Sequence, residues 1–312
     1  MKMILEEKKN VTVFSIQGLT DIPELQFPTF LIFLLCYIII FWGNITIFLV
    51  ILSDSHLHTP MYIFLLNLSL LDISNTSNIL PKILHILLTN HTFISFLGCM
   101  SQMYFFLSLT LSEILLLAAM AYDRYVAICH PLHYFYLMSL RHTFALATSS
   151  WGIGFLDAIG HVVSVSNLSF CASHLIDHIF CDITPLLKIS CSDTFKVEML
   201  TFVEGAILLV PAFLLTLISY VFIISTILQI RSAEGRQKAF STCTSHLTCV
   251  TIFYGTIICL YMRPTTSYFP KQDKFFALLY IVLIPMLNPV IYSLKNQDVK
   301  SALKKLKKKI MC

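Results

Sequence analysis

The sequence predicts an all-α membrane protein, a bundle of seven transmembrane helices. Composition is the first observation: 57% of the residues are hydrophobic and 12% are charged, whereas about 25% of the residues in a soluble domain are charged. The second is that apolar residues gather into seven runs of spanning length, each of roughly 20 residues or more. These runs are 27–52, 60–88, 99–128, 144–165, 199–230, 242–261 and 275–294. Only helices cross a bilayer as separate segments, because lipid offers no hydrogen-bond partner to the backbone and a helix makes its backbone hydrogen bonds within itself.

The distribution of positive charge orients the bundle. Lysines crowd the end of the chain, and basic residues also flank one connection, at Arg231, Arg236 and Lys238. The positive-inside rule places both regions in the cytoplasm, and an odd number of spans then places the N-terminus outside. We therefore expect an extracellular segment 1–26, a transmembrane bundle 27–294 and a cytoplasmic amphipathic helix and tail 295–312.

The two ends of the chain carry their own signals. We expect no signal peptide, because residues 1–21 hold no apolar core of the needed length. Asn10 heads an Asn-Val-Thr glycosylation acceptor, which an outside N-terminus makes usable. In the tail, apolar residues recur at i, i+4, i+7 and i+11, as Val299, Leu303, Leu306 and Ile310. This spacing favours an amphipathic helix on the anionic inner leaflet over a solvated lysine-rich tail.

Three polar side chains near the middle of the membrane are candidate functional groups. Asn44 in the first run could simply bond a neighbouring helix. Asp72 and Glu113 are harder to dismiss, because an unpaired carboxylate in lipid is costly. Glu113 lies on a stripe of the third run whose members step by threes and fours from Cys99 to Arg124. Such a stripe faces the bundle interior, and a packed core explains its Met and Phe residues but not Glu113.

Charged residues also stand at particular places on other runs. Asp123 and Arg124 lie side by side at the end of the third run, where they are expensive unless they pair or meet a partner. In the outer half of the fourth run, Asp157 and His161 are four residues apart and could pair or contact a ligand. Glu204, in the outer half of the fifth run, is the most specific feature for ligand choice unless it only faces the wet mouth of the bundle.

Four cysteines are expected in the oxidising compartment: Cys99, Cys171, Cys181 and Cys191. They allow three pairings, and the sequence does not choose among them. A zinc or copper site at His178, near Cys181 and Asp182, is a weaker candidate. A disulfide at Cys181 would remove the best ligand of that site.

Four strings carry a recognisable signature. They are LHTPMY at 57–62, MAYDRYVAIC at 120–129, KAFSTCTSHL at 238–247 and PMLNPVIY at 285–292. The second is far more specific than a bare Asp-Arg-Tyr. Together they resemble the vertebrate odorant receptors, a family of rhodopsin-like G-protein-coupled receptors. Tyr254 stands where other rhodopsin-like receptors usually have tryptophan, which favours the olfactory branch.

The resemblance implies a function, a location and a disulfide pattern. The chain would lie in the plasma membrane, in sensory cilia if olfactory, and bind a small volatile or hydrophobic molecule. It would activate a stimulatory olfactory-type G protein and so raise cyclic AMP. Cys99 would pair with Cys181, and Cys171 with Cys191. Membrane lipids complete the expected partners; we expect no nucleic acid, no catalysis and no cofactor beyond a sodium ion as an allosteric modulator.

The resemblance and the positions above assign candidate residues to three groups. The ligand-binding group lies in the outer half: Phe106, Leu107, Thr110, Leu111, Glu204, Tyr254, Ile258 and Tyr261. The switch and G-protein group is Asp123, Arg124, Tyr220, Lys238, His246, Asn288, Pro289 and Tyr292. The sodium or polar network is Asn44, Asp72 and Glu113, with Asn288 beside it. The family supports Asp72 in that role, whereas Glu113 replaces the small polar residue of many other receptors.

Three rival functions fit less well. A transporter or channel also uses intramembrane acids, but it needs inverted repeats or broken helices in matching halves, and neither is seen. An intramembrane enzyme lacks support, because the chain has nine glycines and no phosphate-cradling Gly-x-Gly-x-x-Gly string. A receptor for a peptide or an amine is the nearest alternative, but amine receptors usually carry an acid where Phe106 and its neighbours are apolar.

Overall fold

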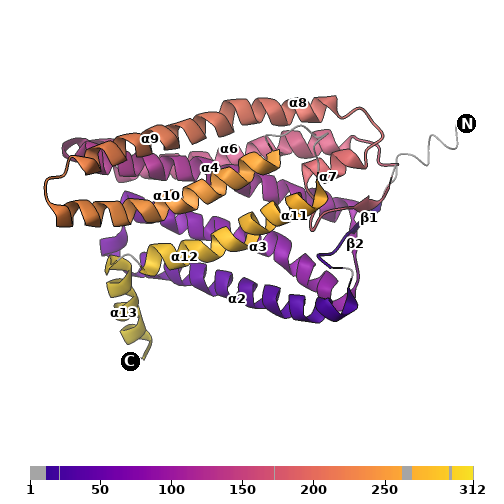
Figure 1. The fold of residues 1–312 in the computed structure, drawn as a ribbon, viewed down its shortest axis with the longest axis horizontal. Helices are drawn as coiled ribbons and strands as arrows, with labels where there is room; N and C mark the ends of the chain where they lie inside the picture. Colours follow the sequence, from indigo (N-terminus) through magenta and orange to yellow (C-terminus); the bar gives the residue numbers. More distant parts are fainter. Residues whose placement is uncertain (1–11, 21, 172, 262–268, 295–296, 312) are drawn as a thin grey trace, which may run out of the picture.

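The computed structural model describes residues 12–20, 22–171, 173–261, 269–294 and 297–311, and the structural statements below concern these residues. Long helices run side by side along the longest axis of the molecule (Figure 1). They are α2 (Pro23–Ser53), α3 (Pro60–Thr89), α4 (Phe96–Cys129), α6 (Leu140–Ser166), α8 (Phe195–Glu204) continued by η3 (Gly205–Leu209) and α9 (Val210–Leu228), α10 (Ala233–Tyr261), and α11 (Pro270–Leu278) continued by η5 (Leu279–Leu283) and α12 (Ile284–Leu294).

Shorter elements lie at the two ends of the bundle. The end marked by the N-terminus in Figure 1 carries β1 (Val13–Ile16), β2 (Phe93–Ser95), β3 (Leu175–Ile176) and α7 (Ile183–Lys188). The opposite end carries η1 (Ser55–Leu57), η2 (Pro131–His133), α5 (Tyr134–Leu137) and α13 (Gln297–Met311). We call these the outer end and the inner end.

The helices are apolar enough for a membrane. Five segments have the length and composition to cross one: Pro23–Ser53, Pro60–Thr89, Phe96–Cys129, Phe195–Leu228 and Pro270–Ile291. A shorter apolar segment, His246–Tyr261, lies within α10. Long apolar helices are therefore confirmed, and the count of seven spans stays a prediction. α10 begins at Ala233 rather than at 242, because the polar residues before its apolar run also take up helix at the inner end.

α4 is the central helix, packed against α3, α6 and α9. Of its most apolar 18 residues 78% are buried, against 28% for the peripheral α2. α6 approaches α4 closely at Gly154, where an added Cβ would overlap the Ser112 side chain and the Ser108 carbonyl. Gly152, two residues earlier, has open space around the same position. Only the absence of a side chain at Gly154 lets the two helices pack at this distance.

Two of the long helices contain a turn of π-helix, and each turn lies just before a proline. η3 precedes Pro211, and η5 precedes Pro285. Proline has no N–H to donate, and its ring collides with the carbonyl four residues back, so a wider turn relieves both problems. The carbonyl of Ile281, which Pro285 cannot bond, accepts a long hydrogen bond of 3.5 Å from Thr76 Oγ1. Such turns often mark functional sites.

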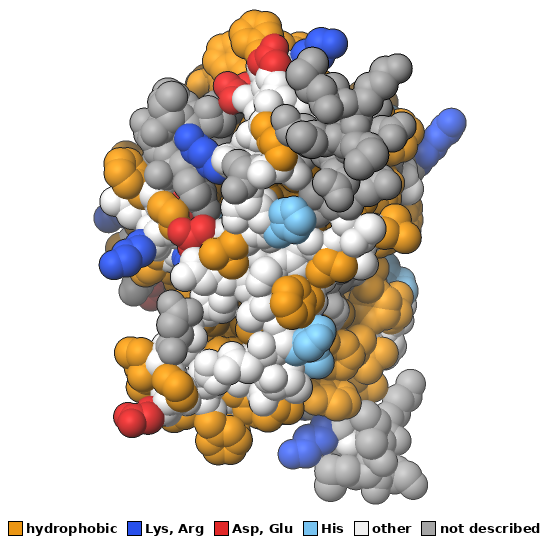
Figure 2. All heavy atoms as spheres, turned by 90° about the vertical axis from the view of Figure 1, so that its right-hand side faces the viewer, with side chains coloured by type: hydrophobic (Ala, Val, Ile, Leu, Met, Phe, Trp, Pro, Cys, Tyr) orange, Lys and Arg blue, Asp and Glu red, His pale blue; other side chains and the backbone are white. Residues whose placement is uncertain are grey.

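A small sheet closes the outer end, and an all-α expectation misses it. β1 pairs with β2 in antiparallel register, Val13 opposite Ser95, and with β3 in parallel register, Ser15 opposite Leu175. The alternating side chains of Phe14 and Ile16 are fully buried beneath it. Figure 2 looks onto this end, where charged and histidine side chains lie scattered among hydrophobic ones.

Two disulfides tie the outer loop. Cys99 at the start of α4 bonds Cys181, with 5.4 Å between the Cα atoms, and Cys171 bonds Cys191, with 5.9 Å. The structure thus has the pairing that the family resemblance implies. Cys181 is also fully buried, and its N–H donates to Gln102 Oε1 of α4 at 3.0 Å. The loop is therefore part of the packed structure.

The inner end is held by the packing of α13 and by an ion pair. The amphipathic helix α13 packs Val299 and Ala302 into the bundle, while Leu303 is 40% exposed. Lys305 Nζ lies 3.0 Å from Asp54 Oδ2. The hydrogen bond from Lys305, together with those from His56, lowers the pKa of the Asp54 carboxyl to about 2. This carboxylate, whose side chain is 13% exposed, is therefore ionised at any physiological pH.

Candidate functional site

A cavity lies near the outer end, between α4, α7, α8, η3 and α10. Its lining is mostly apolar with a few polar groups: Leu107, Thr110, Leu111, Ile114, Ile183, Thr201, Glu204, Gly205, Leu209, Ile257 and Tyr261. Its free volume is about 50 Å³. An apolar cavity with a small number of polar groups is the usual form of a small-molecule site.

Five of the eight expected ligand contacts line this cavity: Leu107, Thr110, Leu111, Glu204 and Tyr261. Two other expected contacts, Phe106 and Tyr254, are buried but do not line the cavity. Phe106 packs on Phe180, with 4.7 Å between ring centroids. The Tyr254 hydroxyl donates to the carbonyl of Ile114, a lining residue, at 3.3 Å.

Ile258, the eighth expected contact, lies off this cavity. Its side chain is 36% exposed and does not line the cavity, whereas the adjacent Ile257 is 2% exposed and does. One residue along a helix turns the side chain by roughly 100°, so an error of one position moves a contact off the face. Thr201 could have been found from its place one turn before Glu204 on the same face. Ile183 could not, because it reaches the cavity from a loop.

The outer loop closes the cavity through Asp182. Tyr261 of α10 donates to both Asp182 carboxylate oxygens, at 3.1 and 2.9 Å, and the N–H of Ile183 donates to the same side chain at 2.8 Å. Burial raises the pKa of Asp182 to about 6, although these hydrogen bonds oppose the rise. The loop and α10 are thus joined beside the lining residue Tyr261.

The metal site considered at His178 and Asp182 is not formed. Cys181 is in a disulfide, and the Asp182 carboxylate is taken by Tyr261 and Ile183. His178 is buried with its ring against Phe180, 4.7 Å between centroids. Burial, and then the charge of Lys274, lowers the pKa of His178 to about 3, so its ring is neutral. The three residues serve the packing of the loop.

A polar network lies beneath the cavity, in the core of the bundle. Tyr280 of η5 donates to Glu113 Oε2 at 2.9 Å, and its oxygen accepts from Asn75 at 2.7 Å. Thr110, which lines the cavity, lies 3.1 Å from the same hydroxyl. Glu113 is thus two contacts away from the cavity, through Thr110 and Tyr280.

Asp72 and Asn44 make further polar contacts in the core of the bundle. Asn288 of α12 donates to Asp72 Oδ2 at 2.9 Å, and Asn44 donates to the Pro285 carbonyl at 3.0 Å. Within the described residues, three buried oxygens have no hydrogen-bond donor: Oδ1 of Asn44, of Asp72 and of Asn75. Buried oxygens of this kind suit a hard cation. Gly43 also lets α12 come close, because an added Cβ would lie 3.1 Å from the Pro289 ring.

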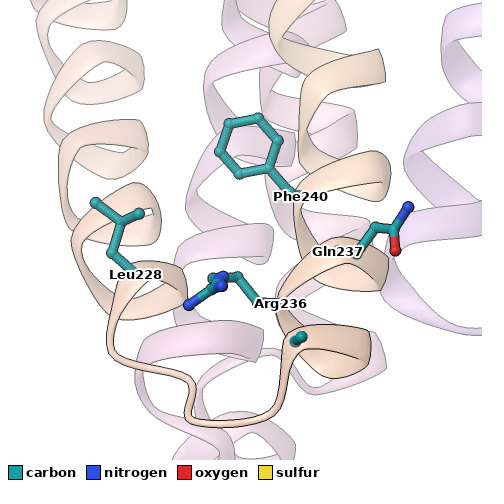
Figure 3. Close-up of a pocket in the computed structure, with 5 residues that line it drawn as sticks. Leu228, Arg236, Gln237 and Phe240 are labelled. Atoms are coloured by element: carbon teal, nitrogen blue, oxygen red, sulfur yellow. The ribbon is translucent and has the colours of Figure 1, made fainter.

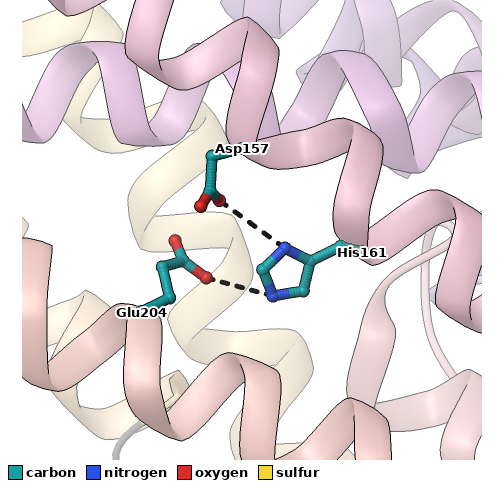
Figure 4. Close-up of side chains that lie close together, drawn as sticks. All are labelled: Asp157, His161 and Glu204. Atoms are coloured by element: carbon teal, nitrogen blue, oxygen red, sulfur yellow. Dashed lines mark ion pairs between the residues drawn. The ribbon is translucent and has the colours of Figure 1, made fainter.

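A second polar cluster joins α6 to α8 beside the cavity (Figure 4). His161 Nδ1 lies 3.5 Å from Asp157 Oδ2, one turn back on α6, and His161 Nε2 lies 3.1 Å from Glu204 Oε2 on α8. The sequence suggested the first contact by its spacing. It gave no sign of the second, because no spacing rule relates two helices. Glu204 therefore belongs both to the cavity wall and to this cluster.

At the inner end, the Asp123 carboxylate accepts a hydrogen bond of 2.9 Å from Tyr134 of α5. Among the described ion pairs within 4.0 Å, none joins Asp123 to Arg124. The Tyr220 hydroxyl contacts His246 Nδ1 and so links α9 to α10, with both side chains buried. The expected partner of Asp123 is thus replaced by a tyrosine of the connection after α4.

A groove lies where α9 ends and α10 begins. Figure 3 shows Leu228 of α9 facing Arg236 and Phe240 of α10, with Gln237 turned away from them. The groove therefore offers one basic and several apolar side chains at the inner end.

Three expected sites cannot be placed: Asn10 and the side chains of Lys238 and Tyr292 lie outside the described part of the structure.

Comparison with known proteins gives one consistent result. The family model described as olfactory receptor matches residues 33–309. The chain is 49% identical to olfactory receptor 5AR1 of Mus musculus over 301 residues, which are 96% of this chain and 97% of that protein. It is 49% identical to olfactory receptor 5B21 of Homo sapiens over 306 residues, 98% of this chain and 99% of that protein. The chain belongs to the olfactory receptor family, and is thus a multi-pass membrane protein that senses odorants as a G-protein-coupled receptor rather than an enzyme.

Proposed function

We propose that the chain crosses the plasma membrane seven times, binds a small volatile or hydrophobic molecule in the cavity beside Glu204, and activates a stimulatory olfactory-type G protein, raising cyclic AMP. The N-terminus is outside, α13 is inside, and sensory cilia are the site of action. One observation carries the binding site: the apolar cavity contains Thr110, and Thr110 contacts the buried Tyr280–Glu113 pair. A ligand there reaches the core of the bundle directly.

The small size of the cavity supports activation by a population shift. Its free volume is about 50 Å³, whereas ligand pockets typically measure about 300–1,000 Å³. An odorant therefore binds a more open packing better than this one and shifts the population toward it. The π turn η3 contributes Gly205 and Leu209 to the wall, and η5 carries Tyr280. These turns are the places where α8 and α11 can change their register at low cost.

The inner end then rearranges. α10 moves its inner half away from α9, which breaks the Tyr220–His246 contact. The kink at Pro289 lets the end of α12 move beside it. Arg124, Lys238 and Tyr292 meet the G protein together with the groove at Arg236 and Phe240. Asp123, held by Tyr134, keeps the connection after α4 in position for this partner.

Cyclic AMP production in cells that express the chain with an olfactory-type stimulatory G protein tests this function. Across a panel of odorants, including amines and acids, every response should vanish with Arg124→Ala, while Glu204→Gln should change the response to some odorants only. Ile257→Ala should shift the half-maximal odorant concentration by about tenfold, because it removes apolar contact from the cavity wall and each buried CH₂ group is worth about 0.8 kcal/mol.

Ile258→Ala is the matched control, because this neighbour faces outward. Surface expression is measured for each variant by flow cytometry. Equal shifts for the two isoleucine variants, at equal surface expression, would refute this cavity as the binding site.

We also propose that a sodium ion binds among Asp72, Glu113 and Asn44 and favours the resting state. This proposal is supported by the buried Oδ1 atoms of Asn44 and Asp72, which accept no hydrogen bond from the described residues. Replacing external sodium by a large organic cation should raise basal cyclic AMP in the wild type. Glu113→Gln and Asp72→Asn should make basal signalling insensitive to sodium. An unchanged sodium response in both variants would end the proposal.

A further inference from the structure

We propose that Asp157, His161 and Glu204 bind a divalent transition-metal ion, which bridges α6 and α8 at the edge of the cavity. One ligand atom from each residue can be chosen so that all three lie within 4.8 Å of one another. The His161 side chain is 1% exposed, and each carboxylate residue is 24% exposed. The histidine is thus fixed by packing, while the two acids keep some freedom to move.

The histidine points into the cluster without a hydrogen bond. Both ring nitrogens lie 3.1 to 3.5 Å from a carboxylate oxygen, yet neither has hydrogen-bond geometry to any described residue. Buried polar side-chain atoms rarely lack such a partner. In Figure 4 the two carboxylates approach the same side of the ring, from different helices. An ion between them would use one imidazole lone pair and one oxygen from each acid.

The donor set selects the class of ion. Imidazole with two carboxylates suits Zn²⁺ and its neighbours, whereas Mg²⁺ and Ca²⁺ prefer oxygen donors alone. Tetrahedral zinc with bonds of about 2.0–2.2 Å holds its ligand atoms roughly 3.3–3.6 Å apart. The distance between His161 Nε2 and Glu204 Oε2 is already 3.1 Å. The chosen ligand atoms of the three residues lie within 4.8 Å of one another, so a zinc ion would draw the two carboxylates closer to the ring.

The net charge of the three side chains also favours a divalent ion. With a neutral imidazole the cluster carries two negative charges, which a divalent ion cancels. Three protein ligands also leave a fourth position of zinc open to water. Because Glu204 lines the cavity, a bound ion would neutralise its carboxylate in the cavity wall. Metal binding would thus change both the charge of the proposed odorant site and the contact between α6 and α8.

Direct metal binding tests the proposal, whether or not an odorant is known. The purified full chain in lipid nanodiscs is dialysed against a series of Zn²⁺ concentrations, and bound zinc is measured by mass spectrometry. The wild type should bind one saturable ion with a contribution from His161. His161→Gln should weaken this binding by more than about tenfold, the loss that removing even an outer-shell partner can cause. Excess Mg²⁺ should not compete.

His174→Gln is the matched control, because His174 is an exposed histidine of the outer loop. It should leave zinc binding unchanged. Asp157→Asn repeats the test if His161→Gln does not fold. X-ray absorption should show one nitrogen at about 2.0 Å from the zinc, with oxygens making up the rest. Equal zinc binding by the wild type and both cluster variants, or no saturable binding, overturns the proposal and leaves the cluster as a contact between α6 and α8 only.

Discussion

The outer and inner ends of the bundle are held together by different means. At the outer end, two disulfides, a three-stranded sheet and the buried Asp182–Tyr261 contact fix the loop against α4 and α10. At the inner end, the described contacts are noncovalent: Tyr134 with Asp123, Tyr220 with His246, and Lys305 with Asp54. A rigid outer end keeps the cavity formed, and a noncovalent inner end can rearrange when the cavity changes.

Two aspartates show the same contrast. Asp182 at the outer end is buried, and its pKa is raised to about 6. Asp54 at the inner end is paired with Lys305 and His56, and these partners lower its pKa to about 2. Burial thus determines the direction of the pKa shift of Asp182 at the outer end, whereas pairing with Lys305 and His56 determines that of Asp54 at the inner end. Three predictions follow, from the largest expected effect to the smallest; the first and third test this difference, and the second tests the core that both ends share.

Cys99→Ser should have the largest effect. The Cys99–Cys181 bond spans a sequence separation of 82 residues and is the one that ties the loop to α4, whereas Cys171–Cys191 spans 20 within the loop. Losing a native disulfide typically costs about 2–5 kcal/mol, and the chain-entropy model assigns more to the longer loop. We expect almost no Cys99→Ser receptor at the cell surface by flow cytometry, and a smaller loss for Cys171→Ser.

Cys259→Ser controls for the loss of a thiol, because Cys259 is free and exposed. It should reach the surface at the wild-type level. If Cys99→Ser were expressed and signalled as well as this control, the outer end would not depend on covalent closure.

Gly154→Ala should have the next largest effect, in the core shared by both ends. An added methyl collides with Ser112 and the Ser108 carbonyl and pushes α6 from α4. Overpacking a core costs typically about 1–3 kcal/mol. Thermal unfolding of the purified receptor should show a lower midpoint for Gly154→Ala. Gly152→Ala, with open space around it, should match the wild type, and similar midpoints for the two variants would show that this close contact does not matter for stability.

The long helices were predictable, because each apolar run of spanning length has few alternatives to helix. The sheet was not, because β1 is four residues long and its partners come from distant loops. The i, i+4 spacing indicated the contact of Asp157 with His161, but Glu204 reaches His161 from another helix. The exposure of Ile258 shows the same limit: the helix was expected, while its rotation depends on packing that a single sequence does not reveal.

The smallest expected effect is a pH dependence that distinguishes the two ends. The folded pKa of Asp182, about 6, is raised above its ordinary value of 3.8. The neutral Asp182 carboxyl therefore contributes fully to the stability of the fold below about pH 3.8. This contribution is lost as the pH rises through about 6, because the charged form is disfavoured only in the folded state. Asp182→Asn, which stays neutral, should be more stable than the wild type by a margin that is largest near about pH 7.5.

Lowering the pH to about 5 should shrink that margin by about 1–2 kcal/mol, since each unit of pKa difference is worth about 1.4 kcal/mol. Asp54→Asn is the control at the inner end. The folded pKa of Asp54, about 2, is lowered, so its contribution is present above about pH 3.8 and is lost only below that range. The difference in unfolding midpoint between Asp54→Asn and the wild type should therefore stay constant between these two pH values. A margin for Asp182→Asn that is equally constant would mean that burial does not raise the pKa of Asp182, and that the loop does not pack around this carboxyl as the contact with Tyr261 implies.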